Sequence, residues 1–203
     1  PAGDDVDRTM RRIESEAARL ARLVEDLLLL ARLDGHHGSD DLPLHPAPMD
    51  LRTLAADALH DLRALDSARP VELTGPDGGP PASAPVLGDE SRLRQAVSNL
   101  VGNAVRHTPP GTPVRVIVGA EGTEAVLTIE DDGPGLTAEQ ASLVFERFYR
   151  ADASRSRSGD GGTGLGLAIV HSVVAAHRGR VELRTAPGEG TAFRIVLPRL
   201  AET

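Results

Sequence analysis

The first part of the chain carries a heptad repeat of apolar side chains. Residues 4–34 contain no glycine or proline, and apolar residues recur there in steps of four and three, at Ile13, Ala17, Leu20, Val24, Leu27 and Ala31. This spacing places them along one face of a single long helix. Leu23, Leu28 and Leu30 widen the apolar stripe, which is typical of a helix in a bundle. A single amphipathic helix packed on its own domain is the alternative.

After this helix the pattern changes to a linker, residues 35–48, which is rich in Gly, Pro and Asp. Residues 49–203 are then predicted to form one domain. Its three helices begin after Asp50, Asp89 and Gly164 and end near residues 68, 107 and 177. Strands are predicted at 71–75, 114–119, 125–130, 180–185 and 191–197, with a loop at 77–85. Three helices on a mixed sheet make a two-layer α/β sandwich.

Composition excludes several classes of function. The chain has 203 residues, of which 40% are apolar, and this suffices for a packed core. It has no cysteine, so disulfides and thiolate metal sites are excluded. The formal net charge of −8 disfavours direct binding of nucleic acid. The longest uninterrupted apolar run, residues 27–31, is far too short to span a bilayer, so we expect no transmembrane segment in this chain.

The predicted second helix carries a row of polar side chains. Asn99, Asn103 and Arg106 fall together at i, i+4 and i+7, on a different face from the apolar residues. Amide oxygens are hard ligands suited to Mg²⁺, and a guanidinium can neutralise phosphate oxygens. Taken alone, the row would be better explained as a solvated helix face.

Two glycine-containing segments follow. Asp131 ends a predicted strand in the sequence DDGPG. A buried carboxylate there can accept a hydrogen bond from the adenine amino group, and the glycines allow the backbone to approach a flat base. Residues 161–166, GGTGLG, open the third helix, whose N-terminus favours a phosphate. Because the chain has no lysine, arginine and a metal ion must neutralise the phosphate charge.

Between these segments lies FERFY, residues 145–149, which holds three of the four aromatic residues of the chain. Small and polar residues follow it as far as the glycine-rich segment. Aromatic anchors beside such a segment predict a lid that closes over a nucleotide. The alternative is a hydrophobic cluster followed by an ordinary loop, and both interpretations are compatible.

The order of these motifs resembles the histidine kinase branch of the superfamily shared with gyrase, MutL and a heat-shock chaperone. NLVGNAVRHT is similar to the family's N box, DDGPG to its G1 box, FERFYRAD to its F box and GTGLGLAIV to its G2 box. Gly190-Thr191-Ala192-Phe193 completes the series. The resemblance covers essentially the whole chain. It implies a Bergerat-type ATP-binding fold, with ATP and Mg²⁺ as cofactors.

The resemblance also implies roles for individual residues. Asp131 binds adenine, Asn103 is the Mg²⁺ ligand, and Asn99 supports the metal and the phosphates. Arg106 and His107 occupy phosphate-facing positions, Arg147 is a candidate for contacting the γ-phosphate, and Thr191 helps to hold the adenine side. The catalytic candidates are therefore Asn99, Arg106 and Arg147. The other expected nucleotide contacts are Gly133, Gly135, Tyr149, Gly162, Thr163, Gly164, Leu165, Gly166 and Leu167.

One position separates the branches of this superfamily. In the ATP-hydrolysing members, a glutamate four residues before the metal-binding Asn activates water. Here that position is Asn99, and an amide cannot act as a general base. We therefore expect transfer of the γ-phosphoryl group to a better nucleophile, a histidine, in preference to hydrolysis. The alternatives are an ATP hydrolase or clamp of the same superfamily, and a nonenzymatic module for nucleotide binding and dimerisation.

The acceptor histidine of the family lies on a first bundle helix, in a His-Glu/Asp-Leu-Arg-x-Pro context that this sequence lacks. Residues 1–34 resemble the second bundle helix. We therefore expect the acceptor helix upstream in the intact protein, and a chain that binds ATP without phosphorylating itself. The resemblance further implies a homodimer through the bundle helix, a response regulator receiver domain as partner, and a cytoplasmic location in a parent protein anchored in the bacterial cell membrane.

Overall fold

The computed structural model describes residues 2–34, 44–150 and 163–201. The described elements are α1 (Ala2–Asp34), β1 (Ala47–Asp50), α2 (Leu51–Leu65), β2 (Val71–Thr74), β3 (Pro85–Gly88), α3 (Glu90–His107), β4 (Val114–Glu121), β5 (Glu124–Asp131), α4 (Ala138–Leu143), α5 (Gly166–Ala176), β6 (Arg180–Thr185) and β7 (Thr191–Pro198). All three helices and all five strands that the sequence predicts after the linker are present. Their bounds differ from the prediction by a few residues.

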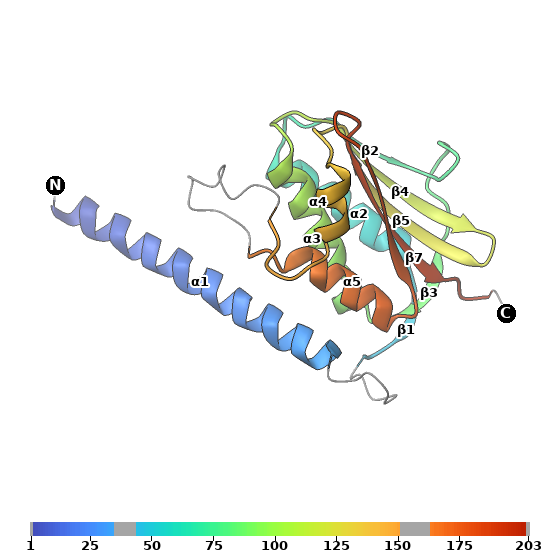
Figure 1. Cartoon of the computed structure of the whole chain (residues 1–203), viewed down its shortest axis with the longest axis horizontal. Coiled ribbons are helices and arrows are strands. Elements are labelled where there is room, and N and C mark those ends of the chain that lie inside the picture. Colours follow the sequence, from blue (N-terminus) through green and yellow to red (C-terminus); the bar gives the residue numbers. More distant parts are fainter. Residues whose placement is uncertain (1, 35–43, 151–162, 202–203) are drawn as a thin grey trace.

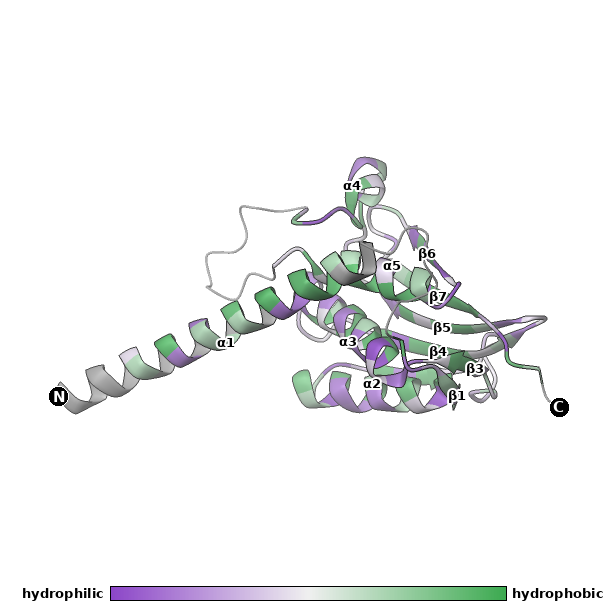
Figure 2. Ribbon diagram, turned by 90° about the horizontal axis from the view of Figure 1, so that it is seen from below, coloured by the Kyte–Doolittle hydropathy of each residue, from purple (hydrophilic) through white to green (hydrophobic). Residues whose placement is uncertain are grey.

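The main sheet has five strands in the order β2-β4-β5-β7-β6. β2 is parallel to β4 and the other pairs are antiparallel, so the sheet is mixed. Helices α2, α3 and α5 lie side by side against one face of this sheet (Figures 1 and 2). The core between the layers is almost entirely aliphatic, with Leu54, Leu100, Leu127 and Ile169 all fully buried. This confirms the predicted two-layer α/β sandwich.

The opposite face of the sheet carries charged residues that pair with residues of other strands. Arg115 on β4 contacts Glu130 on β5, which also contacts Arg184 on β6. Arg194 on β7 pairs with Glu121 at the end of β4. Successive residues of a strand point to opposite faces, so these side chains alternate with the apolar ones of the core. Such exposed pairs contribute little stability, and they mark this face as solvated.

A second, two-stranded sheet joins β1 and β3 in antiparallel register, with Ala47 opposite Gly88. The sequence missed both strands. Each has four residues and contains proline, so the composition of a loop conceals it. Ala47 and Pro48, which were predicted to lie in the linker, therefore belong to β1. The division of the chain at residues 34 and 48 remains a prediction.

Asp89 joins three parts of the chain at the start of α3. As the N-cap, its Oδ1 accepts hydrogen bonds from Arg92 N and Ser91 Oγ, at 3.2 and 2.8 Å. Its Oδ2 accepts the N–H of His45, which precedes β1, at 3.0 Å. Its own N–H donates to Nε2 of the buried His177 at 2.9 Å. Because Nε2 accepts, the proton of this imidazole is on Nδ1, which donates to Val173 O.

Replacing Asp89 by alanine is therefore expected to lower the free energy of unfolding by about 1–2 kcal/mol at pH 7, the usual cost of losing an N-cap. Burial acts to raise the pKa of this carboxyl, but the hydrogen bonds from His45, Ser91 and Arg92 outweigh burial and lower the pKa. A depressed folded-state pKa gives stability above the unfolded value of about 4. That stability is lost as the pH falls through the lower, folded-state pKa.

Urea unfolding of the wild type, Asp89→Ala and Asp89→Asn at pH 7 and in acid measures both effects. The gap between the wild type and Asp89→Ala should narrow in acid. Asp89→Asn keeps a side-chain oxygen and should lose less than Asp89→Ala. Equal stability of all three proteins at pH 7 would show that this junction does not stabilise the fold.

Helix α1 extends away from the domain, and only its C-terminal part lies along α5 (Figure 1). Leu29 and Leu30 are buried in the common core, and Leu23 packs against its edge. The heptad positions behave differently, since the side chains of Ile13, Leu20 and Val24 are more than half exposed. The apolar stripe thus has one part that packs on the domain and one part, the heptad seam, that faces solvent. No helix of the described residues is long and apolar enough to cross a membrane.

Candidate nucleotide-binding site

Helix α3 presents the predicted polar row beside α5. Its apolar face, which includes Leu93, Leu100 and Ala104, is buried in the core. Asn99 and Asn103 are half-buried, and Arg106 and His107 at the end of the helix are exposed. Asn99 Nδ2 donates a hydrogen bond to Gly166 O at 3.3 Å, which joins α3 to the first turn of α5. Asn99, the first residue of the row, thus borders the glycine-rich segment.

Asp131 is the last residue of β5 and is only 5% exposed. Its Oδ1 accepts the N–H of Gly133 at 3.0 Å. Burial raises the pKa of this carboxyl, while hydrogen bonds from the backbone N–H groups of Gly133 and Thr191 and the positive charge of Arg69 oppose the rise. Thr191 is the partner of Asp131 in the β5–β7 register, so the two predicted adenine-side residues are neighbours.

The glycines that follow Asp131 sit where a side chain does not fit. A Cβ on Gly133 would lie 2.6 Å from both Asp131 Oδ1 and Thr108 Cγ2. Gly135 has φ +65°, and its Cβ would lie 1.9 Å from the carbonyl oxygen of Ala186. The DDGPG loop is therefore packed directly on the backbone of the β6–β7 turn.

Thr185 stabilises this contact, although no sequence motif marks it as important. Its Oγ1 donates to Gly190 O at 2.9 Å and accepts the N–H of Leu136 at 2.9 Å. Gly188 N–H also donates to Pro134 O, at 2.7 Å. The loop after β5 and the turn before β7 thus form one unit behind Asp131. A threonine at the end of a strand is too common to predict such a role.

The glycine-rich segment leads into α5 without a side-chain cap among the described residues. The N-cap position is Leu165, whose N–H lies 3.3 Å from Thr163 Oγ1. An uncapped helix N-terminus suits an anion. Thr163, Gly164, Gly166 and Leu167 are half-buried. Gly162 and the greater part of the predicted lid lie outside the described residues.

Gly164 connects this segment to the FERFY motif. Its carbonyl oxygen accepts the N–H of Phe148 at 2.9 Å, and Phe148 has the positive φ of 63°. Phe145 packs edge-on against Phe193 of β7, with ring centroids 6.2 Å apart. Tyr149 is half-buried and Arg147 is exposed. The motif therefore anchors the chain at both the glycine-rich segment and the sheet, which supports the predicted hydrophobic cluster.

Helix α4 precedes that motif and was not predicted. Thr137 Oγ1 accepts the N–H of Gln140, and Gln140 Oε1 accepts the N–H of Thr137, so the helix begins with a capping box. The Thr-x-x-Gln spacing is a recognised sign of a helix start and could have revealed it.

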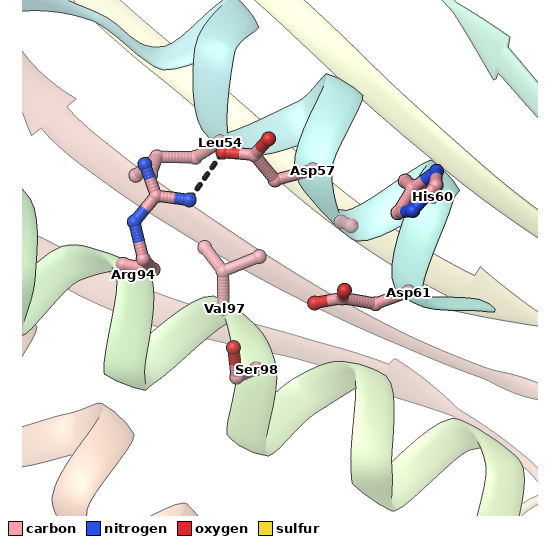
Figure 3. A pocket seen from close by; sticks show the side chains of 8 residues that line it. Leu54, Asp57, His60, Asp61, Arg94, Val97 and Ser98 are labelled. Carbon is pink, nitrogen blue, oxygen red and sulfur yellow. Dashed lines mark hydrogen bonds and ion pairs between the residues drawn. The ribbon is translucent and has the colours of Figure 1, made fainter. Parts of the chain in front are cut away.

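A cavity of about 240 Å³ lies between α2 and α3 (Figure 3). Asp57 and Asp61 of α2 face Arg94, Val97 and Ser98 of α3, and Arg94 pairs with Asp57 across the gap. None of its lining residues belongs to the predicted nucleotide site.

Comparison with known proteins shows to which family this chain belongs. Residues 88–201, more than half of the chain, match the family model described as histidine kinase-, DNA gyrase B- and HSP90-like ATPase. The chain belongs to this ATPase family. The matched residues run from β3 through β7 and include every predicted nucleotide contact, so the predicted family and its ATP-binding fold are confirmed.

Curated members of the ATPase family are similar to nearly the whole chain. The probable sensor histidine kinase TcrY of Mycobacterium tuberculosis is 45% identical over 204 residues, which cover 97% of this chain and 40% of TcrY. The phosphate regulon sensor protein PhoR of Pseudomonas aeruginosa is 38% identical over 186 residues, 92% of this chain and 40% of PhoR. The chain therefore spans about two fifths of the length of these relatives.

Solved structures of the same ATPase family share the fold. The mycobacterial sensor histidine kinase MprB superposes with a TM-score of 0.64 at 34% identity, over 77% of this chain and 99% of that one. The full-length ShkA, in complex with AMPPNP, gives 0.75 at 28% identity, over 95% of this chain and 38% of ShkA. Because ShkA covers nearly all of the chain, the likeness includes α1 as well as the domain.

Proposed function

We propose that this chain is the catalytic ATP-binding part of a sensor histidine kinase. It transfers the γ-phosphoryl group of ATP to a histidine on a separate bundle helix, for relay to the receiver domain of a response regulator. The observation that carries the proposal is the place of Asn99. This amide stands on α3 beside the glycine-rich start of α5, where the hydrolysing branch would need a carboxylate base.

The described residues divide into an adenine side and a phosphate side. Asp131, buried between Gly133 and Thr191, accepts a hydrogen bond from the adenine amino group. The N-terminus of α5, with Thr163, Gly164 and Leu165, receives the phosphates. Arg106, His107 and Arg147 are exposed, and the resemblance assigns them to the phosphate tail. ShkA, solved with AMPPNP, supports nucleotide binding by this fold.

A magnesium ion fits the donor set of the site. Within the described parts of the chain, no three His, Asp or Glu side chains form a metal-binding group. Mg²⁺ bound with a nucleotide takes most of its ligands from phosphates and water and few from the protein. The amide oxygen of Asn103 would supply the protein ligand, and Asn99 would support it. The ion would supply neutralisation of phosphate charge, which a chain without lysine otherwise leaves to arginine.

The transfer step needs positioning more than acid-base chemistry. An imidazole nitrogen of the acceptor attacks the γ-phosphorus, the bond from that phosphorus to the β–γ bridging oxygen breaks, and ADP leaves. The residues of this chain hold the nucleotide, and Arg106 and Arg147 neutralise charge on its phosphates. Asn99, an amide, occupies the position of the general base that would activate water. Hydrolysis stays slow because no carboxylate activates water.

The heptad seam of α1 is the surface proposed for the homodimer. Ile13, Leu20, Val24 and Leu27 are exposed along a helix whose other apolar side packs on the domain. An exposed apolar row of this length suits a bundle with a partner copy and with the acceptor helix. The similarity to TcrY, which is named as a probable sensor histidine kinase, supports the homodimer and a response regulator as a further partner. It also supports a parent protein that is anchored in the membrane with this part in the cytoplasm.

A transfer assay tests the proposal. The chain is incubated with γ-labelled ATP, alone and with a two-helix bundle polypeptide that carries the acceptor histidine of the intact protein. We expect no label on the chain alone and an acid-labile, alkali-stable label on the added polypeptide. Asn103→Ala should remove at least about 90% of that label, since its amide is the proposed metal ligand. Rapid release of free phosphate without label would instead identify a hydrolase.

A further inference from the structure

Arg69 is a buried arginine between α2 and β2, and its side chain is only 1% exposed. Its two terminal nitrogens, Nη1 and Nη2, donate to a single loop, residues 108–113, which follows α3. Nη1 donates to Thr108 Oγ1 at 2.7 Å and to Thr112 O at 2.9 Å, and Nη2 donates to Pro109 O at 3.3 Å. A buried cation that donates three hydrogen bonds to one loop fixes the position of that loop.

The same loop lies directly behind the adenine side of the site. Thr108 Cγ2 lies 2.6 Å from the position that a Cβ on Gly133 would take, so the Thr108 side chain lies directly against the backbone of Gly133. Asp132 N–H donates to Pro113 O at 3.2 Å. Thr108 Oγ1 also donates to Ala104 O at 2.6 Å, within the last turn of α3. Thr108 thus connects Arg69, the helix that carries Asn103, and the loop that follows Asp131.

The positive charge of Arg69 is balanced by the carboxylate of Asp66. Asp66, the C-cap of α2, accepts from Arg69 Nε at 3.2 Å and from Gly111 N–H at 3.4 Å. The same positive charge acts to lower the pKa of Asp131, which burial raises. The adjacent Asp132 acts in the opposite direction, and its own partner is Arg115 of β4. β7 contributes only the backbone N–H of Thr191.

We propose that Arg69 is a positioning residue for nucleotide recognition. It acts through Thr108 to hold the loop 108–113 against Gly133, and so keeps the Asp131 carboxylate oriented for the adenine amino group. This role rests on the proposed function of Asp131. It assigns a purpose to a buried arginine that lies outside the residues matched by the ATPase family model.

Titration calorimetry of ATP with the full chain from pH 6 to pH 8.5 tests the role. Arg69→Met should weaken ATP binding about tenfold or more at neutral pH, because the loop 108–113 loses three hydrogen bonds and no longer holds Gly133 in place. Without the nearby cation the pKa of Asp131 also rises. The loss should grow toward pH 6, whereas a loss caused only by poorer packing would be the same at every pH. Arg69→Lys keeps the charge, so it should restore the pH profile while recovering only part of the affinity.

Two further variants complete the series. Thr108→Val removes the hydroxyl bridge while keeping the volume, and it should weaken ATP binding with no change in the pH profile. Arg180→Met, which removes a paired arginine at an exposed edge of the sheet, is the control and should bind like the wild type. If Arg69→Met does not fold, Arg69→Lys and Thr108→Val carry the test.

The outcomes separate this role from the proposed function. Wild-type affinity and pH profile in folded Arg69→Met, or wild-type affinity in both Arg69→Lys and Thr108→Val, overturns the role of Arg69. Asp131→Ala, measured alongside, should lose ATP binding. If Asp131→Ala keeps it, both proposals fail. If Asp131→Ala loses it while the Arg69 variants do not, only the role of Arg69 fails.

Discussion

Gly135→Ala is expected to unfold part of the nucleotide site, with a loss of about 3 kcal/mol in the free energy of unfolding and loss of ATP binding. Two costs combine at this position. The φ of +65° strains any residue with a Cβ, at about 1–2 kcal/mol. The new Cβ would also lie 1.9 Å from Ala186 O and 3.0 Å from Gly190 O, so the loop must leave the turn that braces it.

Gly188→Ala is the matched control, because it separates strain from crowding. Gly188 lies in the same turn region and has φ +81°, but nothing lies within 4 Å of its Cβ position. We expect only the conformational cost, about 1 kcal/mol, and unchanged ATP affinity. Urea unfolding and nucleotide titration of both variants provide the measurement. Equal effects of the two substitutions would mean that the contact between the loop and the turn does not shape the site.

The sequence predicts the framework of the fold because its signals are local. The caps Asp50 and Asp89 set the starts of α2 and α3, and short segments rich in apolar residues set β4, β5 and β7. Strands β1 and β3 escape prediction because four residues with proline give no period to detect. Their pairing depends on a contact between segments about forty residues apart, which only the folded chain reveals.

In the candidate site, too, the residues in local motifs could be proposed from the sequence, and those that depend on distant contacts could not. Asn99, Asp131 and the glycine-rich segment could be predicted because short motifs hold them, and their order in the chain resembles one family. Arg69 and Thr185 could not be predicted, because their importance comes from atoms that are distant in sequence. The heptad repeat of α1 correctly predicts a long helix, but it does not reveal that Leu29 and Leu30 pack on the domain while the seam stays exposed.

Asp131→Ala is expected to weaken ATP binding about 30-fold or more. A hydrogen bond to a charged acceptor contributes about 2 kcal/mol or more, and a buried site cannot replace it with water at no cost. The side chain is 5% exposed, its backbone is fixed between β4 and β7, and its Oδ1 is held by Gly133 N–H. Few neighbours can move to compensate for its loss.

Asp132 offers a matched control in the next position of the chain. Its carboxylate is about half exposed and pairs with Arg115 on the solvated face of the sheet. Asp132→Ala removes the same charge from nearly the same place without touching the pocket. Calorimetric titration of ATP into the wild type, Asp131→Ala and Asp132→Ala is therefore the most direct test of the site. We expect ATP binding to weaken about 30-fold or more in Asp131→Ala alone, and ATP affinity equal to that of the wild type in Asp131→Ala would contradict the proposed site.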